Sequence, residues 1–310
     1  MKHLRITLFG LIFSLGLIAC QPTKRPPLDL AGHPLPTYNP PPTETPLPLT
    51  ATAEISPTPT QTQIPPTITS TPITCWNESG RIELHHLNTI WLTEPLEYRV
   101  YLPPCYDFES FRLYPVLYLI HGYGYQGDQW INLGASRLMD QLSATGEMDP
   151  FLIVMPYDGD HNALPPENQF GEALRTDLVR VIDENYRTLP SPQYRAIGGL
   201  SRGGNWAIHI GLTNWTVFGQ IGAHSAPLFV TDGPSKIESW LKEIPLDAAP
   251  TVYLDIGESD KWVEHIFRFE ELIDKYDIPH EIHLYPGSHM EEYWAAHTED
   301  YLRWYAQNWE

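Results

Sequence analysis

Apolar residues in this chain gather in short runs that recur from residue 81 to the end, separated by longer stretches with helical spacing. Eight runs have the length of strands, at 81–87, 96–102, 115–120, 151–155, 194–199, 218–223, 251–256 and 281–285. Apolar positions three and four residues apart predict helices over 128–142, 172–186, 202–212, 236–242, 262–276 and 291–308.

The character of the strands changes along the chain. The first two runs alternate polar and apolar positions, which is typical of an antiparallel edge hairpin. The later runs are almost continuously apolar, as strands buried on both faces are. Because strands and helices then follow one another, the pattern predicts an α/β domain with a mostly parallel sheet of about eight strands and helices on both faces.

The first twenty residues have the pattern of an export signal. Lys2 and Arg5 precede an apolar stretch, 6–19, that is shorter than a membrane-spanning helix needs. This stretch ends in Leu-Ile-Ala followed by Cys20, which resembles the lipobox of bacterial lipoproteins. We therefore expect Cys20 to carry lipid and to anchor the chain outside the cytoplasm on a bacterial cell membrane. An ordinary cleaved signal peptide is the alternative.

Residues 21–74 differ in composition from the rest of the chain. They hold fifteen of the 31 prolines, thirteen threonines and few large apolar side chains. Such a segment buries too little apolar surface to offset the entropy of ordering, so it is predicted to be an extended, disordered stalk. Residues 75–310 have a suitable length for one folded domain.

The chain is acidic, with 38 Asp and Glu against 19 Lys and Arg and a formal net charge of −19 at pH 7. All of the excess lies in residues 75–310, which hold 35 acidic and 15 basic residues. A surface of this charge repels nucleic acid and anionic lipid. Neither is expected as a partner, apart from the membrane through the lipid anchor, and a neutral or cationic substrate is favoured.

Two cysteines remain if Cys20 is lipidated. Cys75 and Cys105 form an even pair in an exported and therefore oxidising setting, which predicts a disulfide. It would stabilise the domain by about 3 kcal/mol in the chain-entropy description. Two unpaired buried thiols are the alternative.

A serine between glycines is the most informative local pattern. Gly199, Ser201 and Gly203 fill the G-x-S-x-G motif, between the expected strand 194–199 and the expected helix 202–212. In this nucleophile elbow the serine adopts a strained conformation, and side chains two positions before and after it would clash with the turn. Ser201 is therefore the candidate nucleophile, and a glycine-rich turn that merely contains a serine is the alternative.

A serine hydroxyl needs a base and an orienting carboxylate. Asp260 follows the expected strand 251–256, and His289 follows the expected strand 281–285. Ser201, Asp260 and His289 thus occur in the chain order of α/β-hydrolases. His289 would take the serine proton, and Asp260 would hold the imidazole tautomer.

Several alternatives to these assignments remain open. Glu258, on the same loop as Asp260, is the second candidate for the carboxylate, and Asp255 lies within the strand.

The oxyanion hole needs two backbone N–H donors, for which we predict Arg202 and Tyr123. Gly124 could replace Tyr123.

Several of these motifs resemble one known family. His121-Gly122, the glycine-flanked Ser201, Asp260, and His289 followed by Trp294 are similar to the putative esterase (esterase D-like) family of α/β-hydrolases, over roughly 96–309. The resemblance implies an α/β-hydrolase fold and ester chemistry. It leaves the substrate open, because the family includes feruloyl and acetyl xylan esterases, S-formylglutathione hydrolases, siderophore esterases and mycolyltransferases. Many members have an apolar residue where this chain has Arg202.

Side chains that follow strand ends are candidates for substrate contacts, because ligands bind there in such sheets. Core packing is the alternative for each aromatic residue. The substrate-binding candidates are His121, Tyr125, Trp130, His224 and Trp294, and Asp158 and His161 share this kind of position.

The leading hypothesis is a serine carboxylesterase acting through an acyl-enzyme on small-molecule or polysaccharide-linked esters, such as polysaccharide acetyl or feruloyl esters. Acyl transfer of the mycolyltransferase type uses the same triad and is one alternative. A catalytically silent surface binding domain with the same fold is another. No metal-ligand spacing or phosphate-binding glycine loop is found, so no cofactor and no metal are expected, and the oligomeric state is left open.

Overall fold

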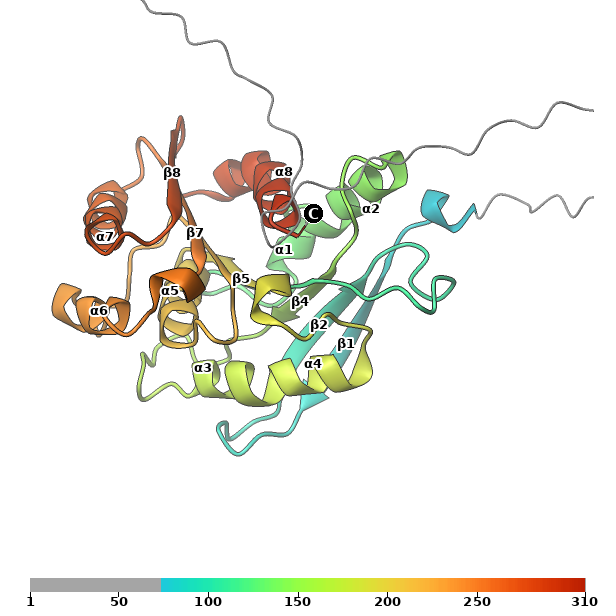
Figure 1. Ribbon diagram of the computed structural model, residues 1–310, viewed down its shortest axis with the longest axis horizontal. Coiled ribbons are helices and arrows are strands. Elements are labelled where there is room, and N and C mark those ends of the chain that lie inside the picture. The colour runs from blue at the N-terminus through green and yellow to red at the C-terminus, as the bar shows by residue number, and fades with distance from the viewer. Residues whose placement is uncertain (1–73, 310) are drawn as a thin grey trace, which may run out of the picture. The chain divides into compact units, whose positions relative to one another are not determined.

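In a computed structural model, which describes residues 74–309, eight strands form one sheet in the order β1-β2-β4-β3-β5-β6-β7-β8 (Figure 1). The strands are β1 (Arg81–Leu87), β2 (Leu96–Leu102), β3 (Val116–Ile120), β4 (Leu152–Pro156), β5 (Arg195–Leu200), β6 (Gln220–His224), β7 (Thr251–Gly257) and β8 (His280–Tyr285). β2 pairs antiparallel with both β1 and β4, and the other neighbours pair parallel. The predicted mostly parallel sheet with an antiparallel edge hairpin is confirmed.

Helices cover both faces of the sheet. The α-helices are α1 (Gln129–Asn132), α2 (Ala135–Thr145), α3 (Phe170–Glu172), α4 (Val179–Asn185), α5 (Arg202–Thr213), α6 (Pro234–Leu241), α7 (Val263–Lys275) and α8 (Glu291–Gln307). A π-helical stretch, Ala173–Leu178, joins α3 to α4, and short 3-10 helices occupy Thr74–Asn77, Pro192–Tyr194 and Leu246–Ala248. In Figure 1, α2 and α8 lie above the sheet and α4 lies below it.

The core is divided by the sheet because successive side chains of a strand point to opposite faces. In β3, Leu117 and Leu119 belong to the cluster that α1, α2 and α8 complete. Tyr118 and Ile120 of the same strand belong to the cluster that α4, α5, α6 and α7 complete. All five residues of β3 are buried, which explains its continuously apolar sequence.

The structure differs from the sequence-based expectation in two helices. The helix expected over 128–142 is divided into α1 and α2, because Gly134 lies between them with a φ of 92°. A left-handed residue interrupts the helical hydrogen bonds, and glycine adopts that conformation without a steric penalty. The helix expected over 172–186 contains the π-helical stretch. No helix within residues 74–309 combines the length and apolarity that crossing a membrane requires.

A disulfide joins Cys75 to Cys105, as predicted, with a Cα–Cα distance of 5.1 Å. It links the 3-10 helix at the start of the described chain to the turn that follows β2. The predicted export signal, the lipidated Cys20 and the stalk up to residue 73 lie outside the described residues.

Candidate active site

The turn between β5 and α5 holds Ser201 in a strained conformation. Its φ is 52° and its ψ is −118°, a region that costs a residue with a side chain about 1–3 kcal/mol. The Ser201 N–H donates to the His224 carbonyl oxygen of the neighbouring strand at 2.8 Å, and its carbonyl accepts from the Asn205 N–H at 3.1 Å. The sheet and the first turn of α5 together maintain the strain.

The glycines on either side of the serine are required by close backbone contacts. A Cβ on Gly199 would lie 2.4 Å from the carbonyl carbon of Gly203. A Cβ on Gly203 would lie 2.1 Å from the carbonyl oxygen of Ile120 in β3. Because backbone atoms cannot move aside as side chains can, only glycine fits at both positions.

The three residues predicted to form a catalytic triad are hydrogen-bonded in sequence. His289 Nε2 lies 2.9 Å from Ser201 Oγ, and His289 Nδ1 lies 2.8 Å from Asp260 Oδ2. Asp260 is 3% exposed, and its other oxygen accepts the Trp262 N–H at 2.9 Å. The carboxylate therefore favours the tautomer with hydrogen on Nδ1, which leaves Nε2 free to accept the serine proton.

Backbone hydrogen bonds join the loops that carry Asp260 and His289. The Glu258 N–H donates to the Tyr285 carbonyl and the Ser259 N–H donates to the Gly287 carbonyl, each at 2.8 Å. The loops after β7 and β8 are thereby held together. Glu258 itself is exposed, so the structure brings Asp260 to His289 and leaves Glu258 outside.

Asp255, the other carboxylate considered from the sequence, lies in a buried network. Its Oδ1 is 2.7 Å from His224 Nδ1, and its Oδ2 accepts the hydroxyl hydrogens of Tyr293 and Tyr301. Both His224 and Asp255 are 0% exposed. This second His–Asp pair therefore supports the strand beneath the elbow and is closed to a substrate.

The predicted oxyanion donors lie beside the serine. Tyr123 and Arg202 line the same cleft as Ser201, and Arg202 is the first residue of α5. The N–H of Gly124 already donates to His161 Nδ1 at 3.2 Å, which favours Tyr123 over Gly124 as the second donor. The roles of the two N–H groups stay a prediction.

A cleft of about 590 Å³ opens at Ser201. Its wall is largely apolar and aromatic, and several of its side chains are well exposed, among them Tyr123 at 60%, Val230 at 87% and Met290 at 56%. The cleft is lined by Gly122, Tyr123, Tyr125, Leu164, Leu200, Ser201, Arg202, Asn205, Pro227, Leu228, Phe229, Val230, Lys261, Trp262, His289, Met290, Glu291, Glu292 and Trp294.

Two of the predicted substrate contacts lie in this cleft, and three do not. Tyr125 and Trp294 line it, and the Trp294 ring stands edge-on to the His289 ring at 5.0 Å. His121, Trp130 and His224 are at most 1% exposed and are absent from the lining. The expectation is corrected for these three.

The three side chains point into the protein interior, where each of them is hydrogen-bonded. The Trp130 indole donates to the Ile120 carbonyl at 3.0 Å, and the His224 ring is bonded to Asp255 as described. His121 Nδ1 is 2.8 Å from the Gly122 carbonyl oxygen, and His121 Nε2 accepts the Asp158 N–H at 3.0 Å.

Burial lowers the pKa of His121 to about 4. The hydrogen-bond geometry agrees, because Nε2 faces a backbone N–H and can only accept. His121 is therefore held as the neutral ring with hydrogen on Nδ1. This state suits a structural role in the loop before Tyr123, and not proton transfer with a substrate.

One wall of the cleft was not anticipated from the sequence. It is formed by residues 227–230, in the loop after β6, and the Leu228 N–H donates to the side-chain oxygen Oδ1 of Asn205 at 2.9 Å. Position after a strand was the only available signal, since these residues carry no motif.

Within residues 74–309, no group of three or more His, Cys, Asp and Glu side chains is arranged to hold a metal ion.

Comparison with known proteins gives a family match across most of the described chain. The profile of the family described as "Putative esterase" matches residues 91–305. An endo-1,4-beta-xylanase/feruloyl esterase from Xylanibacter ruminicola is 33% identical over 156 residues, which cover 48% of this chain and 20% of that protein. The match thus spans about a fifth of the relative's length.

Solved structures share the fold at lower identity. A ferulic acid esterase superimposes with a TM-score of 0.66 at 24% identity, covering 74% of this chain and 99% of that one. A mutant feruloyl esterase module from Clostridium thermocellum complexed with sinapinate gives a TM-score of 0.65 at 18% identity, covering 77% of this chain and 94% of that one. An S-formylglutathione hydrolase from Staphylococcus aureus gives a TM-score of 0.59 at 17% identity, covering 74% of this chain and 98% of that one.

Proposed function

Because this chain belongs to the putative esterase family, we propose that it is a serine carboxylesterase that works through an acyl-enzyme intermediate. One observation carries the proposal. Ser201 Oγ, on a strained elbow, lies 2.9 Å from His289 Nε2, and Asp260 holds the other ring nitrogen at 2.8 Å. This arrangement has the geometry that activates a serine hydroxyl.

In the first half of the proposed reaction, Ser201 Oγ attacks the ester carbonyl carbon while His289 Nε2 takes the hydroxyl proton. The negative charge that develops on the carbonyl oxygen accepts hydrogen bonds from the backbone N–H groups of Tyr123 and Arg202. Asp260 stabilises the imidazolium. The tetrahedral intermediate collapses when His289 donates its proton to the leaving alcohol oxygen, which yields the alcohol and the acyl-enzyme.

The second half repeats the sequence with water. His289 Nε2 takes a proton from a water molecule as the water oxygen attacks the acyl carbon. The same two N–H groups stabilise the second oxyanion. His289 then returns the proton to Ser201 Oγ, so that the acid is released and the free enzyme is restored.

We favour an aromatic acyl group, as in hydroxycinnamate esters of polysaccharides. Several aromatic side chains line the cleft together with the serine, including Tyr123, Tyr125, Trp262 and Trp294. Aromatic rings pack well against one another edge-to-face or offset. The volume of about 590 Å³ suits a small aromatic acid, and the names of the relatives above point to feruloyl esters.

The direct test compares ester hydrolysis by the purified chain and by Ser201→Ala. Initial rates are recorded with acetyl, butyryl, octanoyl and feruloyl esters, and Ser239→Ala, an exposed serine on α6, serves as the matched control. We expect Ser201→Ala to lose about 10⁴- to 10⁶-fold in kcat and Ser239→Ala to keep the wild-type rate. Undiminished turnover by Ser201→Ala would overturn the proposal.

Two readouts separate the other candidate functions. An acyltransferase would pass the acyl group to an added alcohol in preference to water. A catalytically silent domain would neither hydrolyse any ester nor be labelled at Ser201 by a fluorophosphonate. For the esterase we expect labelling at Ser201 and the free acid as the main product.

We also propose that the domain works outside the cytoplasm, held to a bacterial membrane by lipid on Cys20. The lipobox-like sequence before Cys20 supports this location. The Cys75–Cys105 disulfide supports it independently, since disulfides persist in oxidising compartments.

A further inference from the structure

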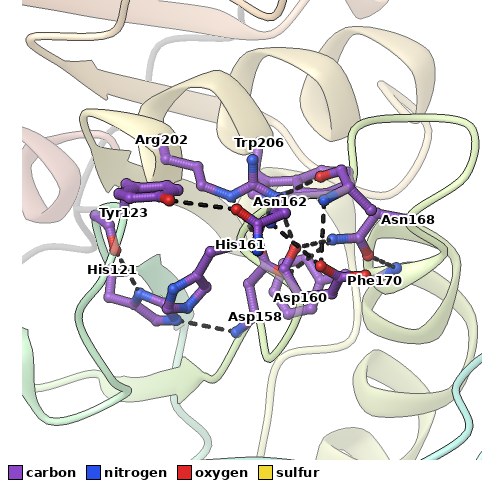
Figure 2. A network of polar contacts seen from close by, with 12 residues as sticks. His121, Tyr123, Asp158, Asp160, His161, Asn162, Asn168, Phe170, Arg202 and Trp206 are labelled. Carbon is purple, nitrogen blue, oxygen red and sulfur yellow. Dashed lines mark hydrogen bonds and ion pairs between the residues drawn. The ribbon is translucent and has the colours of Figure 1, made fainter.

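The side chain that follows the candidate nucleophile is buried and bonded on several sides. The Arg202 side chain is 7% exposed, and its Nε donates to Asp158 Oδ2 at 2.8 Å. Its Nη2 donates to the carbonyl oxygens of Asp160, at 3.1 Å, and Ala163, at 2.7 Å. Figure 2 shows the guanidinium directed toward Asp158 and Asp160. Because the charge of the guanidinium is compensated within the protein, we assign the Arg202 side chain no contact with substrate.

Asp158 holds more than the arginine. It is 1% exposed, and its Oδ2 also accepts the indole N–H of Trp206 at 2.9 Å. Its Oδ1 accepts the Asn168 side-chain amide at 2.9 Å. Because Arg202 and Trp206 are one turn apart on α5, the carboxylate fixes the beginning of this helix against the loop after β4.

The same loop is bonded to the segment that carries Tyr123. The Asp158 N–H donates to His121 Nε2 at 3.0 Å, and His161 Nδ1 accepts the Gly124 N–H at 3.2 Å. The Tyr123 hydroxyl lies 3.3 Å from the side-chain oxygen of Asn162 (Figure 2). We call residues 158–163 the bridging segment, because they contact both the start of α5 and the loop after β3.

We propose that Arg202 is a positioning residue, whose side chain acts through the bridging segment to fix the distance between the two oxyanion donors. The donors are the backbone N–H groups of Arg202 and Tyr123, so the inference rests on the esterase function proposed above. The backbone N–H of Arg202 is one of the two donors. The side chain of Arg202, through its bond to Asp158, fixes the position of the other donor, the Tyr123 N–H.

Physical reasoning favours this role because the two donors come from separate segments of chain. A catalytic arrangement must be held within about 0.5 Å of its productive geometry. Loss of one oxyanion donor costs about 10²- to 10³-fold in kcat. If the two donors are held less firmly, kcat should therefore fall by part of this factor. KM should change little, because the oxyanion forms only in the transition state.

The test uses the full-length protein and four variants. Arg202→Met and Arg202→Lys remove or weaken the bond to Asp158. The double variant Arg202→Met with Asp158→Asn also removes the carboxylate charge that the single variant would leave unpaired. Arg195→Met is the matched control, because Arg195 has the same 7% exposure and pairs with Asp183 at 2.7 Å at the opposite end of β5.

We expect Arg202→Met to lower kcat about 10- to 100-fold with KM changed less than about threefold. Rates are taken per site labelled to completion by a fluorophosphonate, so that unfolded protein does not count. Arg202→Lys should retain more activity than Arg202→Met. The double variant should regain stability while kcat stays low, and Arg195→Met should lose stability and keep the wild-type kcat.

A tetrahedral mimic provides a readout that a purely structural role would not move. Phenylboronic acid forms a boronate on the serine and places an oxygen in the oxyanion hole. Its inhibition constant should rise in Arg202→Met by about the same factor as kcat falls, whereas ferulate binding should stay unchanged. Wild-type kcat and boronate affinity in Arg202→Met, or equal losses in Arg195→Met, would overturn this inference alone. A wild-type protein without turnover or labelling would overturn the esterase function with it.

Discussion

At the scale of single residues, the partners of three histidines decide which of them can act as a base. The His289 side chain is 20% exposed and bonded to both a serine and a carboxylate. His224 also has a carboxylate partner but is fully buried, with its ring stacked on Tyr301 at 3.7 Å. Both ring nitrogens of His121 are engaged by the backbone. Of these three histidines, only His289 combines access to the cleft with an Nε2 that can accept the Ser201 hydroxyl hydrogen.

The lowered pKa of His121 predicts a pH dependence of folding stability. This pKa is about 4 in the folded protein, because of burial, and about 6.5 in an unfolded chain. Between these values the unfolded state binds more protons, so the free energy of unfolding should fall as the pH drops from about 6.5 toward 4. The loss due to His121 is on the order of 3 kcal/mol.

Urea unfolding of the wild type and of His121→Gln across this pH window measures the effect. The variant should be less stable near neutral pH, but its stability should decline less steeply with acid. Parallel curves for the two proteins would show that His121 takes up its proton as readily when folded as when unfolded, against the prediction.

Gly203 offers a second prediction at this scale. Because a Cβ there would lie 2.1 Å from the Ile120 carbonyl oxygen, Gly203→Ala should destabilise the fold by about 3 kcal/mol and displace the elbow. A Cβ on Gly233 would meet no atom within 4 Å, so Gly233→Ala should stay within about 1 kcal/mol of the wild type. Thermal unfolding compares them, and similar midpoints for both variants would contradict the steric argument.

At the scale of elements, the site is assembled from loops at the carboxyl edge of the sheet. Tyr123 follows β3, Ser201 follows β5, Asp260 follows β7 and His289 follows β8. These strands are parallel, so the loops that follow them emerge at the same edge. For this reason Ser201 and His289 are hydrogen-bonded although they lie 88 positions apart in the sequence.

The loop after β7 allows a direct comparison of its two carboxylates. Asp260 is buried against His289, whereas Glu258 is exposed. Asp260→Asn should lower kcat by about 10⁴-fold, because an amide favours the wrong histidine tautomer. Glu258→Gln should change kcat less than about threefold. Steady-state kinetics with one ester measure kcat for both variants. An equal loss of kcat in both would show that the loop as a whole, and not its buried carboxylate, is responsible.

At the scale of the whole molecule, the disulfide should contribute stability without contributing to catalysis. Cys75 and Cys105 are 30 residues apart in the chain, a loop whose closure is worth about 3–4 kcal/mol in the unfolded state. Neither cysteine lines the cleft. The double variant Cys75→Ser with Cys105→Ser should therefore unfold at lower urea concentration with kcat per labelled site unchanged. A changed kcat would mean that the bridge also shapes the site.

The proposed lipid anchor predicts where the protein is found. In bacteria that express the full-length chain, a clickable fatty acid should label the wild type, and the protein should sediment with membranes. Cys20→Ser should abolish both the labelling and the sedimentation, whereas the Cys75→Ser and Cys105→Ser double variant should keep them. Membrane-bound, labelled Cys20→Ser protein would exclude this anchor.

Local patterns in the sequence predicted the elements well, and their failures have physical causes. The strand and helix positions agree because each run of apolar residues matches the period of its element. The division at Gly134 was missed because a glycine is also tolerated within a helix. Trp130 and His224 were expected to contact substrate because they follow strand ends, but such positions do not reveal which way a side chain points.

The sequence by itself determined the α/β class, the order of the strands and helices along the chain, and the chemical identity of Ser201, Asp260 and His289 as candidates. These follow from periodicity and from residue types that short motifs require. Only the tertiary structure decided that Asp260 and not Glu258 reaches His289. It also decided that the charge of Arg202 is compensated by Asp158. Contacts between distant segments depend on how strands pair and how loops pack, and no local pattern encodes them.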